Sequence, residues 1–207
     1  MNKEVKYDFF YKQTNHHLVQ QYFSLRTEAF IEQWGLKNFS GAEDQYDSNA
    51  VIIIAHKDGV CVGGARMIIN QVGSNSLLPV ETDKFRIANL LPELDLYKNK
   101  YAELSRIAML KEYRNGEYSA EMYRRLIDVK ARALGIDFLF CVTTMKLART
   151  SRLTLRKLNL PFEIKSNLKV PDLPTYEGHK MVLSLIDLTK VSSTEYQEGK
   201  KVEDLIC

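Results

Sequence analysis

Two oppositely charged residues, Glu103 and Arg106, lie in an otherwise apolar stretch near the middle of the chain. Residues 101–110 read YAELSRIAML, and the loop and helical pattern that follow are typical of a buried strand. A carboxylate can accept a proton and a guanidinium can bind an anion, so this strand is a candidate for chemistry. Residues three apart on a strand point to opposite faces, so we expect each charge to have its own partner. The alternative is that both are solvated charges at an exposed end of the strand.

Three carboxylates gather in a second region of interest, the polar and turn-forming loop of residues 36–48. They are Glu43, Asp44 and Asp47. Arg26 falls within the apolar pattern of the preceding helix, where it could stand at the edge of the core or reach across it.

A further arginine, Arg66, interrupts an apolar strand pattern directly after Gly63, Gly64 and Ala65. Paired glycines inside a strand indicate a bulge or a close approach by another group, although they could also accommodate a tightly packed neighbour.

The elements that must position these residues follow from the spacing of apolar side chains. Strands are expected over residues 5–11, 50–56, 60–69, 101–110, 136–144, 162–164 and 180–186. Helices are expected over residues 17–34, 118–134 and 147–160, with a short helical pattern around 85–91 in a long connection from 71 to 99 that covers part of the sheet. The boundary residues are Thr14 or Asn15 as the first N-cap, Gly35 and Gly135 as helix ends, and Asp58 with Gly59 in a hairpin turn.

This order predicts an α/β fold with a mixed sheet and one parallel crossover. In such a fold a ligand commonly binds where neighbouring strands diverge and a helix N-terminus faces the gap. That place is the end of strand 101–110, facing the loop 111–119 and the strand 136–144.

Composition limits the class of protein. With 207 residues, of which 45% are hydrophobic, the chain can form a single domain, residues 1–207, with a polar tail from about residue 189. No apolar segment approaches the ~20 residues of a membrane span, and the first residues lack the apolar core of a signal peptide. We therefore expect a soluble, cytoplasmic protein.

The cysteines and the net charge argue against two other classes. Cys61, Cys141 and Cys207 have no metal-ligand spacing, and the first two are expected to be small core residues. The net charge of +3 is mild, and without a basic run we expect no nucleic-acid binding. Binding to an acidic partner protein remains an alternative.

Nine residues resemble a known family in their order and approximate spacing. They are Arg26, Phe30, Trp34, Asp44, Asp47, Arg66, Phe85, Glu103 and Arg106. This set is similar to that of the acyl-homoserine-lactone autoinducer synthases, and the segments LLPVE and AELSRIAMLKEYR resemble the related long-chain N-acyl amino acid synthases still more. The resemblance covers residues from about 5 to about 165. It implies a GNAT-like acyltransferase fold, with a mixed central sheet flanked by helices and a splay between the central strands.

The resemblance also implies the acyl donor. The superfamily's pyrophosphate loop, Q/R-x-x-G-x-G/A, is replaced by RNGEYS at residues 114–119, which disfavours acetyl-CoA. The implied donor is an acyl group on the phosphopantetheine arm of acyl carrier protein, with no other cofactor and no metal. Such carriers are acidic, so basic residues could dock them, although the same residues could be solvated helix faces. The docking candidates are Lys111, Arg114, Arg124, Arg125, Lys146, Arg149 and Arg152.

Amide formation needs a base for the amine proton and donors for the developing oxyanion. The resemblance makes Glu103 the first candidate for the base, with Glu43 or Asp44 as competitor. Backbone N–H groups near Ile107 and Ala108 could hold the thioester carbonyl and the pantetheine arm.

The arginines have two alternative roles. Arg26, Arg66 and Arg106 could bind the acceptor's carboxylate, or they could form a structural ion network with Asp47 and Glu103 that orders the acidic loop. For Arg106 and Asp47 we favour the structural role.

Apolar residues would surround the acyl group. The resemblance places Phe30 and Trp34 over the thioester, and residue types alone make them and Phe85 core residues. The tunnel candidates are Phe138, Phe140, Val142, Met145 and Leu153. Thr143 and Thr144 could hydrogen-bond a substituted chain or cap the following helix.

The predicted function is transfer of a long-chain fatty acyl group from acyl carrier protein to the α-amine of an amino acid. The first alternative is an acyl-homoserine-lactone synthase that uses S-adenosylmethionine. The second is a non-catalytic module that binds acyl carrier protein. A CoA-dependent acetyltransferase is a third.

Overall fold

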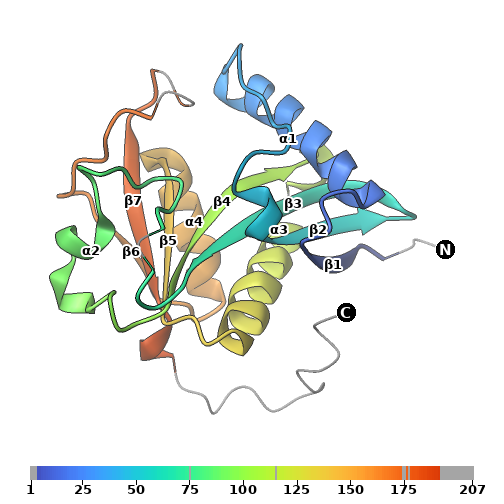
Figure 1. Cartoon of the computed structure of the whole chain (residues 1–207). Helices are drawn as coiled ribbons and strands as arrows, with labels where there is room; N and C mark the ends of the chain where they lie inside the picture. Colours follow the sequence, from blue (N-terminus) through green and yellow to red (C-terminus); the bar gives the residue numbers. More distant parts are fainter. Residues whose placement is uncertain (1–3, 75, 115, 174–175, 177, 192–207) are drawn as a thin grey trace.

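The protein is built on one seven-stranded sheet with strand order β1-β2-β3-β4-β5-β7-β6 (Figure 1). The structure is a computed structural model that describes residues 4–74, 76–114, 116–173, 176 and 178–191. The strands are β1 (Lys6–Tyr11), β2 (Val51–Lys57), β3 (Val60–Asn70), β4 (Tyr101–Met109), β5 (Phe138–Thr144), β6 (Phe162–Ile164) and β7 (Met181–Asp187). All neighbouring pairs are antiparallel except β4 and β5, so the predicted mixed sheet with one parallel crossover is confirmed.

Helices cover both faces of the sheet (Figure 1). The α-helices are α1 (His17–Trp34), α2 (Ile87–Leu90), α3 (Gly116–Tyr123) and α4 (Met145–Lys157), and α3 continues into the π-helical η4 (Arg124–Ala131). One apolar core joins the sheet to α1 and to the connection that holds α2, while a second core joins the other face to α3, η4 and α4. The long connection therefore covers part of the sheet, as predicted. The short 3-10 turns are η1 (Asp47–Asn49), η2 (Pro92–Leu94), η3 (Lys111–Tyr113) and η6 (Leu188–Lys190).

The first helix ends where the sequence predicts but is capped by a different residue. Gly35 takes a left-handed conformation with φ 66° and stops α1. The N-cap is His16, whose Nδ1 accepts a hydrogen bond of 3.3 Å from the N–H of Leu18, so the expectation of Thr14 or Asn15 is wrong. The imidazole of His16 packs against Phe10, with ring centroids 4.5 Å apart, which favours this ring over a shorter polar side chain.

The other two long helices differ slightly from the expected ranges. The second begins at Gly116 and widens into a π-helix after Tyr123. The sequence predicts a regular α-helix here, because π-helices are rare and the spacing of apolar residues does not distinguish the two. The third begins at Met145, and the Thr144 hydroxyl accepts from the N–H of Leu147 at 3.4 Å. Thr144 is therefore the helix cap, one of the two roles considered for it.

The two central parallel strands separate part-way along their length. β4 and β5 pair only at Tyr101 with Phe138, Ala102 with Leu139 and Glu103 with Phe140. Beyond this point β4 stays paired with β3 and β5 stays paired with β7. The predicted splay between the central strands is thus confirmed, and it opens directly beside Glu103.

A bulge in β4 lies at the start of this splay. Arg66 pairs with Ser105 but Gly64 pairs with Ala108, so β4 carries one extra residue, and Arg106 adopts a positive φ of 56°. The glycines indicated an irregularity here, and a side chain on Gly64 would come within 2.7 Å of the Tyr22 ring. The bulge turns Arg106 onto the α1 face, where Glu103 also lies. The prediction that the two charges point to opposite faces is therefore wrong.

Two expectations concern the chain as a whole. No helix in the described ranges has the length and apolar character needed to cross a lipid bilayer. The polar tail expected from about residue 189 is described only as far as Val191, and Cys207 lies outside the described residues.

Candidate active site

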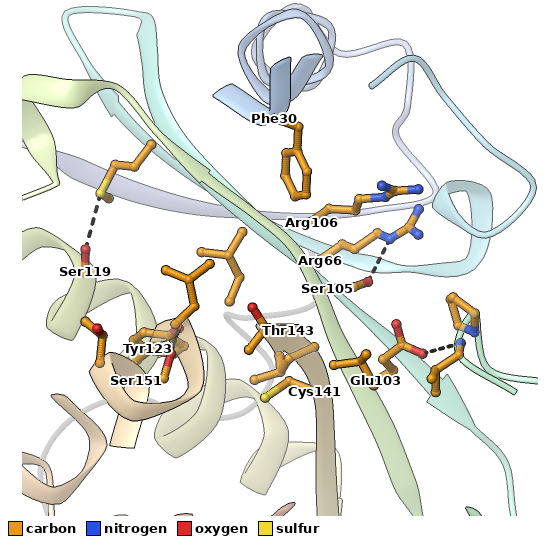
Figure 2. Close-up of a pocket in the computed structure, with 18 of the residues that line it drawn as sticks. Phe30, Arg66, Glu103, Ser105, Arg106, Ser119, Tyr123, Cys141, Thr143 and Ser151 are labelled. Atoms are coloured by element: carbon orange, nitrogen blue, oxygen red, sulfur yellow. Dashed lines mark hydrogen bonds between the residues drawn. The ribbon is translucent and has the colours of Figure 1, made fainter. Parts of the chain in front are cut away.

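A cavity of about 430 Å³ lies at the splay and is lined from both faces of the sheet (Figure 2). Phe30, Trp34 and Arg106 belong to the α1 side, while Tyr123 and Ser151 belong to the side of α3 and α4. Between them the separated strands contribute Glu103, Leu104, Ile107, Cys141, Val142 and Thr143. The opening between β4 and β5 therefore connects two half-sites on opposite faces.

Glu103 lies at the point where the strands separate, and it is 4% exposed. Its Oε2 accepts a hydrogen bond of 3.0 Å from the N–H of Val80. Burial raises the pKa of Glu103 to about 7, and the Val80 hydrogen bond with the charges of Arg66 and Arg106 only partly offsets this effect. A carboxyl group with this pKa is divided between its two protonation states near neutral pH. The alternative of a solvated charge at a strand end is wrong.

Arg26 and Arg66 fasten the acidic loop to the core. Arg26 binds both carboxylate oxygens of Asp47, at 3.0 and 2.7 Å, and also donates to the carbonyls of Gly41 and Ala42. Arg66 donates to Asp44 at 2.6 Å and to Asp47 at 3.0 Å. Burial alone would raise the pKa of Asp47, but the hydrogen bonds and charges of the two arginines outweigh it and lower the pKa. Both arginine side chains are 1% exposed, and their guanidinium groups are occupied by the loop.

Arg106 is held differently from the other two arginines. Among the described residues, its nearest carboxylate oxygen is that of Asp44 at 3.8 Å, and it donates to the hydroxyl of Tyr176 at 3.3 Å. Its guanidinium lies over the Phe39 ring at 4.7 Å and near the Phe30 ring at 5.9 Å. The side chain is 14% exposed and lines the cavity. Arg106 therefore keeps hydrogen-bonding capacity for an anion, and its pairing with Glu103 in a closed ion network is not found among the described contacts.

Tyr176 is a site residue that sequence reasoning missed. It comes from the segment between β6 and β7, and its ring lies 5.5 Å from that of Trp34 and 6.1 Å from that of Phe30. Burial raises its pKa. The same segment is held by His179, whose Nε2 lies 2.7 Å from the carbonyl oxygen of Trp34. A single tyrosine in a polar loop has no periodic pattern that would have identified it.

Two hydrogen bonds shape the strand bulge. The hydroxyl of Tyr22 donates to the carbonyl of Arg106 at 2.6 Å, and Arg66 Nε donates to the hydroxyl of Ser105 at 3.1 Å (Figure 2). They tie α1 to Arg106, the residue with the positive φ, and β3 to Ser105 directly before it. Sequence reasoning missed Tyr22 and Ser105, because their contacts depend on the bulge itself.

The structure brings some of the predicted acyl-binding residues to the cavity and leaves others in the core. Phe30, Trp34, Ile107, Val142 and Thr143 line it. Phe85, Ala108, Phe138, Phe140 and Met145 are not among the lining residues, and Leu153 is 62% exposed on the outer face of α4. Leu153 as a tunnel residue is therefore wrong. Cys61 is buried as expected, whereas Cys141 is only partly buried and lines the cavity.

The competing base candidates and the docking candidates lie at the surface or near the cavity mouth. Glu43 is exposed and does not line the cavity, while Asp44 lines it but is paired with Arg66. The exposed docking candidates are Lys111, Lys146, Arg149 and Arg152. Arg114 lines the cavity and donates to the carbonyl of Met109 at 2.7 Å, and Arg124 and Arg125 pair with Glu121. The neighbouring Asn115 lies outside the described residues. Within the described ranges no group of His, Cys, Asp and Glu side chains is arranged to hold a metal ion.

Comparison with known proteins agrees with the fold. Residues 25–124 match the family model described as acetyltransferase (GNAT) domain. No curated protein sequence matches the chain.

Three solved structures illustrate the shared fold. The AHL synthase LasI is 19% identical with a TM-score of 0.58, over 90% of this chain and 91% of that one. The CoA-dependent acyl-homoserine lactone synthase BjaI, with SAM and isopentyl-CoA, is 15% identical with a TM-score of 0.63, over 89% of this chain and 83% of that one. FeeM, an N-acyl amino acid synthase from uncultured soil microbes, is 14% identical with a TM-score of 0.59, over 91% of this chain and 93% of that one. At these identities the likenesses show the fold.

Proposed function

We propose that this chain, an acyltransferase with a GNAT domain, moves a long-chain acyl group from a phosphopantetheine thioester to the α-amine of an amino acid in the cytoplasm. The acyltransferase class rests on the domain match and on the fold. The donor and the acceptor are our inference from the site. The observation that supports it most is the cavity through the splay, which brings Glu103 between two half-sites of different chemistry.

The donor half lies on the side of α3 and α4. Beyond Glu103, the edge of β4 that faces β5 pairs with no strand in the part of the chain that the structure describes. Its backbone N–H and C=O groups can therefore bind the amides of a pantetheine arm as a neighbouring strand would. An arm in this position places the thioester carbonyl near the backbone of Ile107, the one of the two predicted oxyanion donors that lines the cavity, and directs the acyl chain toward Val142 and the α4 face.

The acceptor half lies on the α1 side. There Arg106 offers a planar guanidinium with the geometry to bind a carboxylate through two hydrogen bonds. Because Arg26 and Arg66 are occupied by the acidic loop, we assign loop ordering to them, for which the sequence left both roles open. We assign acceptor binding to Arg106, in place of the structural role that the sequence favoured for it. Phe30, Trp34 and Tyr176 enclose the same space.

The reaction follows from this placement. The neutral amine attacks the thioester carbonyl, the new C–N bond forms, and the C–S bond breaks with the electron pair leaving on the pantetheine sulfur. The proton of the amine passes to the carboxylate of Glu103, directly or through a water. A pKa of about 7 suits this role, because the group is ionised often enough to accept the proton and basic enough to hold it.

Acyl carrier protein is the proposed bearer of the arm. Lys111 on η3, and Lys146, Arg149 and Arg152 on α4, are exposed on the elements that follow the open ends of β4 and β5. A basic surface at the mouth of the cavity would steer an acidic carrier toward it. CoA carries the same arm, and one of the similar structures is CoA-dependent by its description, so the two bearers have to be compared directly.

An acyl-homoserine-lactone synthase that uses S-adenosylmethionine is the second candidate. LasI and BjaI, which share this fold, carry that activity in their names. The amide step would be the same and would be followed by lactone closure. A non-catalytic carrier-binding module predicts a cavity blocked by side chains, whereas this cavity is open.

The test is an acceptor screen. The protein is supplied with acyl carrier protein bearing a mixed pool of acyl chains, and in parallel with the same chains on CoA, together with amino acids or S-adenosylmethionine. We expect N-acyl amino acids by mass spectrometry, with the carrier protein as the better donor. Methylthioadenosine with an acyl lactone would support the second candidate. Carrier binding without any acylated product would overturn both.

A further inference from the structure

The donor half of the cavity extends inward along α3 and α4, from a mouth near Leu147 to an inner end near Leu155. The helices α3 and α4 begin just after the open ends of β4 and β5 and run back along the strands, so position along them measures depth (Figure 1). The lining residues of α4 recur at helical spacing from Leu147 to Leu155, a distance of roughly 12 Å at the α-helical rise. Leu155, Phe162 and Ile186 form an apolar inner end.

A hydrogen bond links the two helices at the cavity wall, half-way along this depth. The hydroxyl of Tyr123 on α3 lies 3.1 Å from the hydroxyl of Ser151 on α4, and both residues line the cavity (Figure 2). Ser119 stands one helical turn before Tyr123, and Leu155 stands one turn after Ser151. The pair therefore separates a mouth portion, near Leu147 and Ser119, from the apolar inner end.

Opening the pair costs a partly buried hydrogen bond. Burial raises the pKa of Tyr123 to about 12, so its hydroxyl stays protonated and available as a donor or acceptor. An alkyl chain offers no hydrogen-bonding group, so a chain that passes between the two hydroxyls breaks their bond without replacing it. A chain that ends before the pair leaves the bond intact.

The backbone changes at the same place. The α-helix ends at Tyr123 and the π-helical η4 begins at Arg124. π-helical turns are rare and occur frequently at functional sites, because the wider turn shifts the side chains that flank it. This is an observation independent of the hydrogen bond.

We propose that Tyr123 and Ser151 form a gate that sets the length of acyl chain the enzyme accepts. Acyl chains that end on the mouth side of the gate bind while the Tyr123–Ser151 hydrogen bond stays intact. Longer chains must break this bond to reach Leu155, Phe162 and Ile186. The inference rests on the proposed donor, an acyl group on a pantetheine arm. It adds two specificity-determining residues that act on the chain and not on the reacting carbonyl.

The test measures binding without turnover. S-hexyl, S-decyl and S-hexadecyl pantetheine thioethers cannot transfer their chains, and their dissociation constants with the full chain are obtained by calorimetry. We compare the wild type with Tyr123→Phe, Ser151→Ala and the double variant. Each single variant should improve the affinity for the longest thioether relative to the shortest by roughly three- to tenfold, the scale of one hydrogen bond. Because both changes remove the same bond, the double variant should gain no more than either single one.

The control is Tyr97→Phe, which removes an exposed tyrosine hydroxyl bonded to Asn89, away from the cavity. It should keep the wild-type profile. Thermal unfolding of each variant confirms that the fold is retained. Because Tyr123→Phe and Ser151→Ala remove the same bond, either variant alone tests the gate if the other is unstable. Thioethers that bind with the same length profile in all forms would overturn the gate alone. Thioethers that bind to no form would overturn both the gate and the proposed donor, so the two failures are distinguishable.

Discussion

Three arginines that resemble one another in the sequence have different surroundings in the fold. Arg26 and Arg66 are satisfied by carboxylates and carbonyls of the acidic loop, whereas Arg106 lies among aromatic rings with one long approach to Asp44. The sequence identified all three as unusual charges in apolar patterns. It could not separate them, because the difference depends on which groups the loop and the bulge bring within hydrogen-bonding distance.

Replacing Arg106 tests its role in acceptor binding. Arg106→Gln removes a charged group that can donate two hydrogen bonds to one carboxylate. We therefore expect the KM for the amino acid to rise by about 10- to 100-fold, the scale of a hydrogen bond to a charged group. Steady-state kinetics with acceptor and donor varied in turn provide the measurement. The matched control is Arg149→Gln, which should raise the KM for acyl carrier protein and leave that for the amino acid nearly unchanged. Equal effects of the two variants on both substrates would refute the assignment.

At the scale of single residues, the sequence identified Glu103 as a candidate base but left a buried carboxylate and a solvated strand end as alternatives. The structure shows that Glu103 is buried and supplies a cause for a pKa near neutrality. Tyr176, Tyr123 and Ser151 were not found. Each lies in a polar or mixed stretch, where neither period nor composition marks one hydroxyl as different from its neighbours.

Among the elements, the acidic loop depends on one buried carboxylate. Asp47 is fully buried and accepts hydrogen bonds from Arg26, from Arg66 and from the N–H of Asp44. These contacts hold the loop against α1 and β3. They also explain why the loop keeps a defined shape despite its turn-forming composition.

Asp47→Asn should therefore lower the free energy of unfolding by about 3–5 kcal/mol, because it leaves two buried guanidinium groups without their shared counter-ion. Urea denaturation at neutral pH measures the change. Glu43→Gln, in the same loop but exposed, should change stability by less than about 0.5 kcal/mol. If both variants unfold at the same urea concentration, Asp47 does not stabilise the fold as described.

The elements also show where sequence reasoning was accurate. The strands and long helices lie within a few residues of their expected bounds, because the spacing of apolar residues, Gly35 and Gly135 mark these bounds directly. The N-cap of α1, the π-helix and the bulge in β4 were missed or misplaced. Each is decided by contacts over a long sequence distance, such as the ring of Tyr22 beside Gly64 and its hydroxyl on the carbonyl of Arg106.

At the scale of the whole molecule, the central fact is that the sheet opens where its one parallel pair separates. The opening lets a cavity pass from the α1 face to the face of α3 and α4, so two substrates can reach the same point from opposite sides. The order of elements predicted the parallel crossover. The splay followed from the resemblance to autoinducer synthases, since nothing in the local sequence states where two paired strands part.

The most direct test of Glu103 as the catalytic base is the pH dependence of the rate constant for amide formation at saturating substrate concentrations. Because only the carboxylate form of Glu103 accepts the amine proton, the wild-type rate constant should rise as pH rises through about 7. In Glu103→Gln this rise should vanish and the rate constant should fall by about two orders of magnitude, while donor binding is retained. The titration of the amine itself appears equally in both enzymes. An unchanged rate constant in Glu103→Gln, with the rise near pH 7 still present, would contradict the account and move the base to Asp44 or Glu43.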